Sequence, residues 1–183
     1  MMSNQLELEF LSHDSWHQIL AAHNRYTESG GKEGQIADLS AYEIEDFDFS
    51  GLDLSSINAR GSVFTRCRFI GCDLYGVNFN DSSLVSSDFR ESNLGKVEFY
   101  NVDASGACFD NANMGSAEFY QANLRGATFH GTNLRGSSFS DCDLTNAIFN
   151  GANLEYASVT NNKEDRTSWA DVKGMSAANT KRL

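Results

Sequence analysis

The sequence predicts an all-β solenoid, and three observations support this fold class. An apolar residue recurs every five positions from Leu39 to Val159, and no step is polar. A period of five fits neither the α-helix, near 3.6, nor the flat strand, at 2. Proline, which would remove donors from a backbone hydrogen-bond ladder, is absent from the chain. Since fixed short periods are typical of stacked repeats, we expect one elongated repeat domain with short flanking segments.

The other positions of each pentapeptide support the same register. Two residues before the large apolar position lies a small one, such as Cys67, Ser87 or Ala107, which suits a crowded interior. One residue before it, Asp or Asn is frequent, and both tolerate turns and bond to nearby backbone. Two residues after it Gly recurs, as at Gly71 and Gly126, and supplies a conformation that other residues resist.

This motif, A-[DN]-[LF]-x-x, resembles that of the pentapeptide-repeat family. Examples are Ala112-Asn113-Met114, Ala122-Asn123-Leu124 and Ala152-Asn153-Leu154. The resemblance covers residues 37–161 and implies a right-handed quadrilateral β-helix, with one pentapeptide per side and four per coil. It therefore implies about six coils and a rod roughly 30 Å long, at about 4.8 Å per coil.

If four pentapeptides close a coil, residues 20 apart stack on one side, and the sequence meets this condition. Phe-rich and Leu-rich columns alternate around the rod, so we expect a continuous core. One Phe column has no exception: Phe49, Phe69, Phe89, Phe109, Phe129 and Phe149. The neighbouring Leu column is equally regular: Leu54, Leu74, Leu94, Met114, Leu134 and Leu154. The remaining two columns contain Ala59 and Ala104, which predict thin spots in the core.

Residues 1–36 lie outside the register and predict an N-terminal cap. The alternation of Leu6, Leu8 and Phe10 with polar residues predicts a short strand. Residues 12–15 have the composition of a helix N-cap, and Gly30-Gly31 that of a helix end, so we expect a helix at about 14–28. An open solenoid end exposes core and strand edges, and this helix would cover the first coil.

The pattern lapses after Asn161, and we expect residues 162–183 to form a C-terminal cap and tail. Trp169 falls back into the five-residue phase. Together with Val172 and Met175 it is predicted to close the last coil. Because both flanks resemble caps, we expect a monomer.

Composition excludes several classes of protein. The net charge of −11 argues against nucleic acid as a direct ligand, which would need a basic patch. No apolar run is long enough to span a membrane, and no secretory signal precedes the domain, so we expect a cytoplasmic protein. Three of the four cysteines, Cys67, Cys72 and Cys142, fall at the small inward position and predict packing; Cys108 is predicted to face outward.

No pattern in the sequence predicts catalysis, a cofactor or a metal site. Nucleophile-elbow, phosphate-loop, dinucleotide and metalloprotease motifs are all missing. His13 and His17 could share a helix face with His23 near them, but no third metal ligand is fixed beside them. His130, the one histidine of the repeats, is predicted to point outward without an acidic partner. A rod without a cleft offers no water-excluded site, so we expect no enzyme.

Two outward surfaces are candidates for protein binding. The first coil carries a cluster of acidic residues: Glu43, Glu45, Asp46 and Asp48. Tyr100 and Tyr120 are 20 residues apart and therefore one coil apart on one side. Adjacent exposed tyrosines are plausible interface anchors. Equally, a stacked aromatic pair can simply stabilise a sheet face, and the sequence does not separate these interpretations.

Two functional hypotheses follow. The first is a rigid, non-enzymatic scaffold that docks an unidentified protein. The second comes from the family resemblance, because some pentapeptide-repeat proteins confer quinolone resistance by binding DNA gyrase as mimics of duplex DNA. Duplex DNA carries about one charge per 1.7 Å, evenly spread. Here the acidic residues concentrate in the first coil and arginines interrupt the rest, which weakens this second hypothesis.

Overall fold

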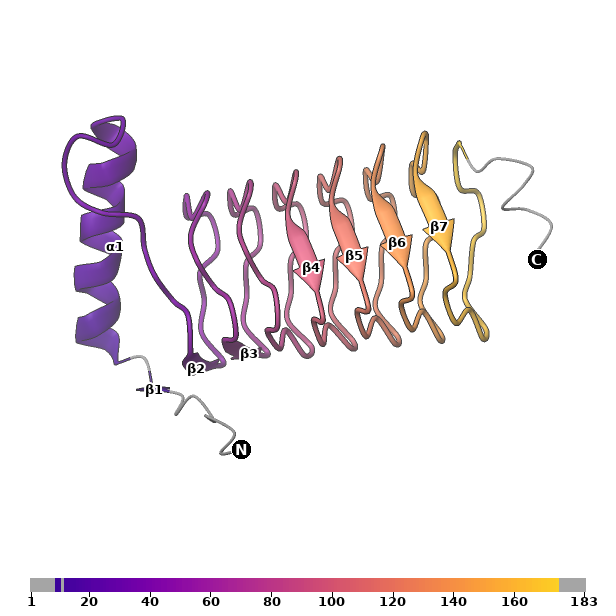
Figure 1. The fold of residues 1–183 in the computed structure, drawn as a ribbon, viewed down its shortest axis with the longest axis horizontal. Helices are drawn as coiled ribbons and strands as arrows, with labels where there is room; N and C mark the ends of the chain where they lie inside the picture. The colour runs from indigo at the N-terminus through magenta and orange to yellow at the C-terminus, as the bar shows by residue number, and fades with distance from the viewer. Residues whose placement is uncertain (1–8, 11, 175–183) are drawn as a thin grey trace, which may run out of the picture.

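The computed structural model describes residues 9–10 and 12–174, which form a rod with one helix at its N-terminal end (Figure 1). The predicted β-solenoid of about six turns with a short N-terminal helix is confirmed. Residues 20 apart in the sequence pair in parallel on every side of the rod, as Asp53 does with Asp73 and Asp88 with Cys108. Five residues per side and four sides per coil therefore set the geometry.

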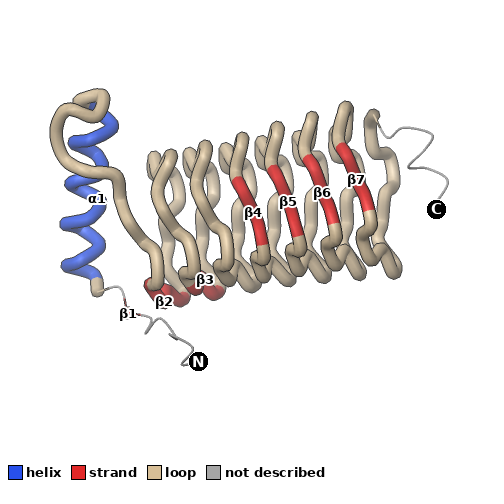
Figure 2. The backbone as a smooth tube through the Cα atoms, in the orientation of Figure 1, coloured by secondary structure: helices blue, strands red, loops and turns tan. Residues whose placement is uncertain are grey.

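The regular strands lie on two sides of the rod (Figure 2). On one side, β1 (Glu9–Phe10) pairs with β2 (Tyr42–Glu45), and β2 pairs with β3 (Val63–Thr65). On another, four parallel strands lie in the order β4 (Glu98–Tyr100), β5 (Glu118–Tyr120), β6 (Ser138–Ser140) and β7 (Ser158–Thr160). Because every strand pair is parallel and in register, equivalent side chains of successive coils lie directly beside one another.

The core consists of stacked side chains. The Phe column from Phe49 to Phe149 is completely buried, and the members of the Leu column from Leu54 to Leu154 are at most 2 % exposed. Rings within a column stack almost in parallel; those of Phe69 and Phe89 have centroids 4.8 Å apart and planes 2° apart. Rings of the two Phe-rich columns meet edge to face, as Phe79 and Phe89 do at 6.1 Å. Ala59 and Ala104, the predicted thin spots, are also fully buried.

Small side chains fill the inner corners and satisfy backbone carbonyls there. Ser92 Oγ donates to Phe89 O at 2.7 Å, and Thr132 Oγ1 donates to Phe109 O at 2.8 Å. The thiol of Cys72 likewise lies 2.8 Å from Phe49 O. Burial raises the pKa of Cys67, Cys72 and Cys142 to about 11, so these thiols are protonated and unreactive at neutral pH.

Each outer corner has one residue in the left-handed region. Every fifth residue from Ala41 to Asp171 has positive φ, and nine of these are glycines. The sequence predicted this requirement from Gly, but the other corners adopt the same conformation with Asn, Asp, Ser and larger residues. Tyr156, with φ of 61°, is the bulkiest of them. Such conformations are unfavourable for residues with a Cβ, so the repeat spacing enforces them.

The N-terminal helix α1 (His13–Glu28) begins one residue before its predicted start and ends where predicted. The Ser12 hydroxyl accepts a hydrogen bond from Ser15 N, which caps the helix. Trp16 is 5 % exposed and packs edge-on against Phe49, with centroids 5.0 Å apart. Helix α1 thereby covers the open end of the first coil.

The winding continues beyond the predicted boundary at residue 161. Lys163, Ser168 and Lys173 pair with residues 20 positions earlier, so 162–174 form part of a further coil where we expected a separate cap. The sequence obscured this continuation because three inward positions, Asn162, Glu164 and Thr167, are polar and half-buried. Trp169 occupies one of them and stacks on Phe149 at 4.2 Å. Leu6, Leu8 and Met175 lie outside the described residues.

Candidate functional site

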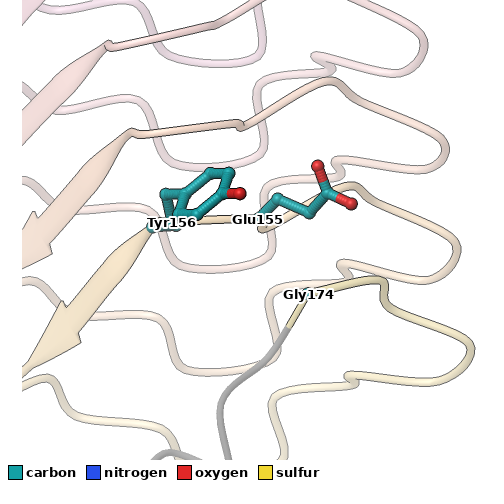
Figure 3. A pocket seen from close by; sticks show the side chains of 4 residues that line it. Glu155, Tyr156 and Gly174 are labelled. Atoms are coloured by element: carbon teal, nitrogen blue, oxygen red, sulfur yellow. The ribbon is translucent and has the colours of Figure 1, made fainter.

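Two hollows among the described residues could receive a ligand, and both lie on the outside of the rod. A shallow hollow of about 370 Å³ lies near the C-terminal end, between Glu155, Tyr156, Ala157 and Gly174 (Figure 3). Another of about 370 Å³ lies at a corner of the first coils and includes Arg60 and Asp81, which form an ion pair at 2.8 Å. Both are open to solvent, so neither provides a water-excluded site.

Neither a metal site nor a membrane-spanning helix occurs over the same part of the chain. None of its His, Cys, Asp and Glu side chains forms a group of three that could hold a metal ion. His23 is fully buried and its Nδ1 accepts a hydrogen bond from Ala37 N at 3.3 Å, while the side chain of His17 is exposed. The two therefore differ completely in environment. No described helix is long and apolar enough to cross a bilayer.

Two arginines of the following coil pair with three of the four carboxylates in the acidic cluster of the first coil. Arg66 forms ion pairs with both Glu45 and Asp46, and its Nε lies 2.8 Å from Asp46 Oδ1. This hydrogen bond holds the pKa of Asp46 below its ordinary value. Arg68 Nε lies 3.8 Å from Asp48 Oδ2. Of the four carboxylates of this cluster, only that of Glu43, which lies opposite Val63, has no Lys or Arg partner among the described residues.

Tyr100 and Tyr120 lie side by side on the outside of the β4–β7 sheet. Their rings meet edge to face, with centroids 6.2 Å apart, and Tyr120 is 44 % exposed. The Tyr100 hydroxyl donates to the carboxylate of Glu118, which raises the pKa of Tyr100 to about 12. The pair thus stabilises the sheet and at the same time presents an exposed ring, so both interpretations of this pair have a structural basis.

Two glutamates lie beside these tyrosines, and the sequence interpretation had overlooked them. Glu98 and Glu118 are directly opposed in the register of β4 and β5, and both side chains are exposed. Asn80 Nδ2 donates to Glu98 Oε2 at 2.9 Å. The spacing of 20 residues would have found this pair, had it been applied to the position before each large apolar residue. We call Asn80, Glu98, Tyr100, Glu118 and Tyr120 the tyrosine face.

Two other exposed tyrosines are each covered by a cation of the same chain. The Arg135 guanidinium lies 5.1 Å from the ring centroid of Tyr156, and the Lys96 ammonium lies 5.7 Å from that of Tyr75. Their rings are therefore already engaged in cation–π contacts. Tyr120 has no such contact within the described part of the chain, which sets it apart from both.

Comparison with known proteins identifies the family. A model of pentapeptide repeats matches eight copies over residues 48–81, 82–120 and 122–161, which is more than half of the chain. The chain belongs to the pentapeptide-repeat family. Its structure supplies the reason for the match, since each matched pentapeptide forms one side of the rod.

Solved structures similar to this chain come from the same family. A trypsin-treated form of QnrB1, a plasmid-mediated fluoroquinolone resistance protein, is 19 % identical with a TM-score of 0.48, over 77 % of this chain and 95 % of that one. HetL, which is involved in heterocyst differentiation in a Nostoc cyanobacterium, is 17 % identical with a TM-score of 0.31, over 82 % and 92 %. Rfr23 from a Cyanothece cyanobacterium is 19 % identical with a TM-score of 0.34, over 72 % and 87 %. Curated proteins gave no match to this sequence.

Proposed function

We propose that this protein is a non-enzymatic scaffold that binds a partner protein on an outer face of the rod. The observation that carries the proposal is the completeness of the core. The stacked columns leave the inward side chains fully buried, so chemically distinctive groups are available only outside. A rigid rod with regularly spaced exposed side chains suits recognition of another surface, whereas catalysis needs an enclosed, pre-organised site.

Of the two candidate surfaces, the tyrosine face is the better supported. Arg66 and Arg68 pair with three of the four carboxylates in the acidic cluster of the first coil, so a partner would have to compete with cations of the same chain there. Tyr120 is exposed and amphipathic, and tyrosine is enriched among the residues that dominate binding energy at interfaces.

Affinity capture with variants of each surface tests this proposal. The full chain would be immobilised as wild type, as Tyr100→Ala/Tyr120→Ala, and with Glu43, Glu45, Asp46 and Asp48 all changed to Lys. We expect a protein that is retained by the wild type and by the acidic-coil variant but lost from the tyrosine variant. If wild type enriches no protein above an unrelated solenoid of similar charge, the scaffold proposal is wrong.

The DNA-mimic hypothesis makes a separate prediction. A mimic of duplex DNA needs a dense, even negative field, and the arginines of this rod pair with carboxylates on several sides. We therefore expect no effect of micromolar protein in a gyrase supercoiling assay, with or without a fluoroquinolone. Inhibition or protection at that concentration would favour gyrase as the partner.

A further inference from the structure

The tyrosine face contains two directly opposed carboxylates, an arrangement that recurs among the described residues where Asp53 lies opposite Asp73. At several other places an arginine bridges to a carboxylate about one coil away, as Arg66 does to Asp46 and Arg135 to Glu155. On β4 and β5, Glu98 instead lies directly opposite Glu118. Like charges at directly opposed strand positions are destabilising. A neutral side chain at either position would avoid this repulsion, so the opposition of the two charges does not itself stabilise the fold.

The partners that these glutamates do have are neutral. Glu98 accepts from the Asn80 amide and Glu118 from the Tyr100 hydroxyl, and both carboxylates keep further acceptor capacity. Strands β4–β7 contain no Lys or Arg. The nearest basic residue in sequence, Lys96, lies over the Tyr75 ring instead. The face is therefore anionic, and no cation of the described chain is bound to it.

The surroundings leave room for an incoming group. Tyr120 follows Glu118 by two residues on the same outward surface and is half-exposed. The next strand, β6, presents only serines beside it, at Ser138 and Ser140. An aromatic ring thus stands beside two opposed carboxylates, and the neighbouring strand presents small side chains.

We propose that the tyrosine face docks an arginine-bearing segment of the partner protein, an inference that rests on the proposed scaffold function. A guanidinium is planar and presents donors in a fork, so it can bridge Glu98 and Glu118 while its face stacks on Tyr120. Lysine offers a compact charge without this planarity. Binding relieves the repulsion between the glutamates, and this relief adds to the attraction of the guanidinium.

Peptide titration followed by NMR tests the inference directly. The probes are acetylated, amidated tetra-arginine and tetra-lysine, added to the isotope-labelled full chain. We expect saturable shifts of the amide resonances of β4 and β5, and tighter binding of tetra-arginine than of tetra-lysine by about threefold or more. Shifts spread evenly over all sides of the rod, or equal affinity for the two peptides, would overturn the proposal.

Matched variants separate this site from general attraction to an acidic protein. Glu98→Gln/Glu118→Gln should weaken tetra-arginine binding by about fivefold or more. The control, Glu91→Gln/Asp110→Asn, removes the same charge from another side of the rod and should change affinity by less than about twofold. Tyr120→Ala should abolish the preference for arginine over lysine. Equal losses in the two double variants would show non-specific electrostatics and reject the site.

Thermal unfolding of the same variants tests whether Glu98 and Glu118 repel each other in the free protein. Because the glutamates repel each other, Glu98→Gln/Glu118→Gln should raise the Tm of the free protein, whereas the control pair should leave it nearly unchanged. A lowered Tm in the Glu98/Glu118 variant would mean that the pair serves folding, against the proposal. The titration needs no natural partner. Its failure therefore rejects only this docking site, while failure of affinity capture alone rejects the scaffold function.

Discussion

The middle of the rod and its N-terminal junction are stabilised in different ways. In the middle, every coil packs on copies of itself, so Phe89 stacks between Phe69 and Phe109 at 4.8 and 5.1 Å. At the junction, a helix with no repeat packs on the first coil through Trp16 and the buried His23. The difference teaches that repetition provides most of the stability, whereas the junction contains the contacts that are unique and therefore easiest to disturb separately.

The largest effect is expected from Phe89→Ala. Its ring is fully buried with stacked neighbours on both sides, so truncation leaves a cavity that a stiff column cannot fill. We expect a loss of about 3–5 kcal/mol in the free energy of unfolding, measured by chemical denaturation. A loss below about 1 kcal/mol would contradict the packing of the column.

A smaller and more local effect is expected from Trp16→Ala. The ring of Trp16 contacts the rings of Phe47 and Phe49, and the centroids are 5.8 and 5.0 Å apart. These contacts are confined to the N-terminal end of the rod. Local stability should fall by about 3 kcal/mol, the lower end for a buried aromatic residue. Amide hydrogen exchange should accelerate in residues 37–56 but not around Phe89, because coils couple mainly to their neighbours. Uniform acceleration along the rod would refute this separation of the two regions.

The junction is also expected to respond to pH through His23. Burial lowers the pKa of His23 below its usual 6.5, and the nearby Asp53 opposes this only in part. The unfolded state therefore binds this proton more readily, so stability is full above the usual pKa and falls as the pH drops below it. Protonated Nδ1 also could no longer accept from Ala37 N.

Hydrogen exchange of residues 37–56 at pH 7.5 and pH 5 measures this response. We expect protection to fall at the lower pH in the wild type but not in His23→Gln, whose side chain keeps an acceptor. His130→Gln, at an exposed position, is the control and should behave like wild type. The same pH response in His23→Gln would assign it to other groups.

The smallest effect concerns a corner. Gly126 has φ of 65°, and a Cβ added there would meet no atom within 4 Å. Gly126→Ala should therefore cost about 1 kcal/mol through backbone conformation alone. Chemical denaturation of Ser116→Gly, at an equivalent corner with φ of 58°, should show a gain of similar or smaller size. A neutral Gly126→Ala would mean that the corner relaxes out of the left-handed region.

The repeated part of this structure could be predicted from the sequence, and the reasons are physical. The five-residue register predicts both the burial of Phe89 and the left-handed conformation of Gly126, because equivalent positions of every coil have the same environment. The junction follows no repeat, so the environment of His23 depends on how helix α1 docks. Trp169 was recognised as in phase, but the continuous coil around it was not predicted, because the inward positions Asn162 and Glu164 are polar.

Only part of the candidate site could be predicted. The 20-residue spacing brought Tyr100 and Tyr120 together, since neighbouring coils fix their separation. The sequence could not show that Arg66 forms an ion pair with Asp46. A long side chain at a corner can reach several carboxylates, and only the structure shows which of them it contacts. That choice, visible only in the structure, moves the favoured surface from the acidic first coil to the tyrosine face.

Mapped thiol labelling of the native, unmodified protein tests the inward and outward assignment most directly. Cys67, Cys72 and Cys142 occupy inward positions and are at most 2 % exposed, whereas Cys108 points outward and is half-buried. With a small alkylating reagent and mass-spectrometric mapping, we expect Cys108 to react first and the other three only after unfolding. Labelling of Cys67, Cys72 or Cys142 as fast as Cys108 in the folded protein would contradict the register on which every surface described above depends.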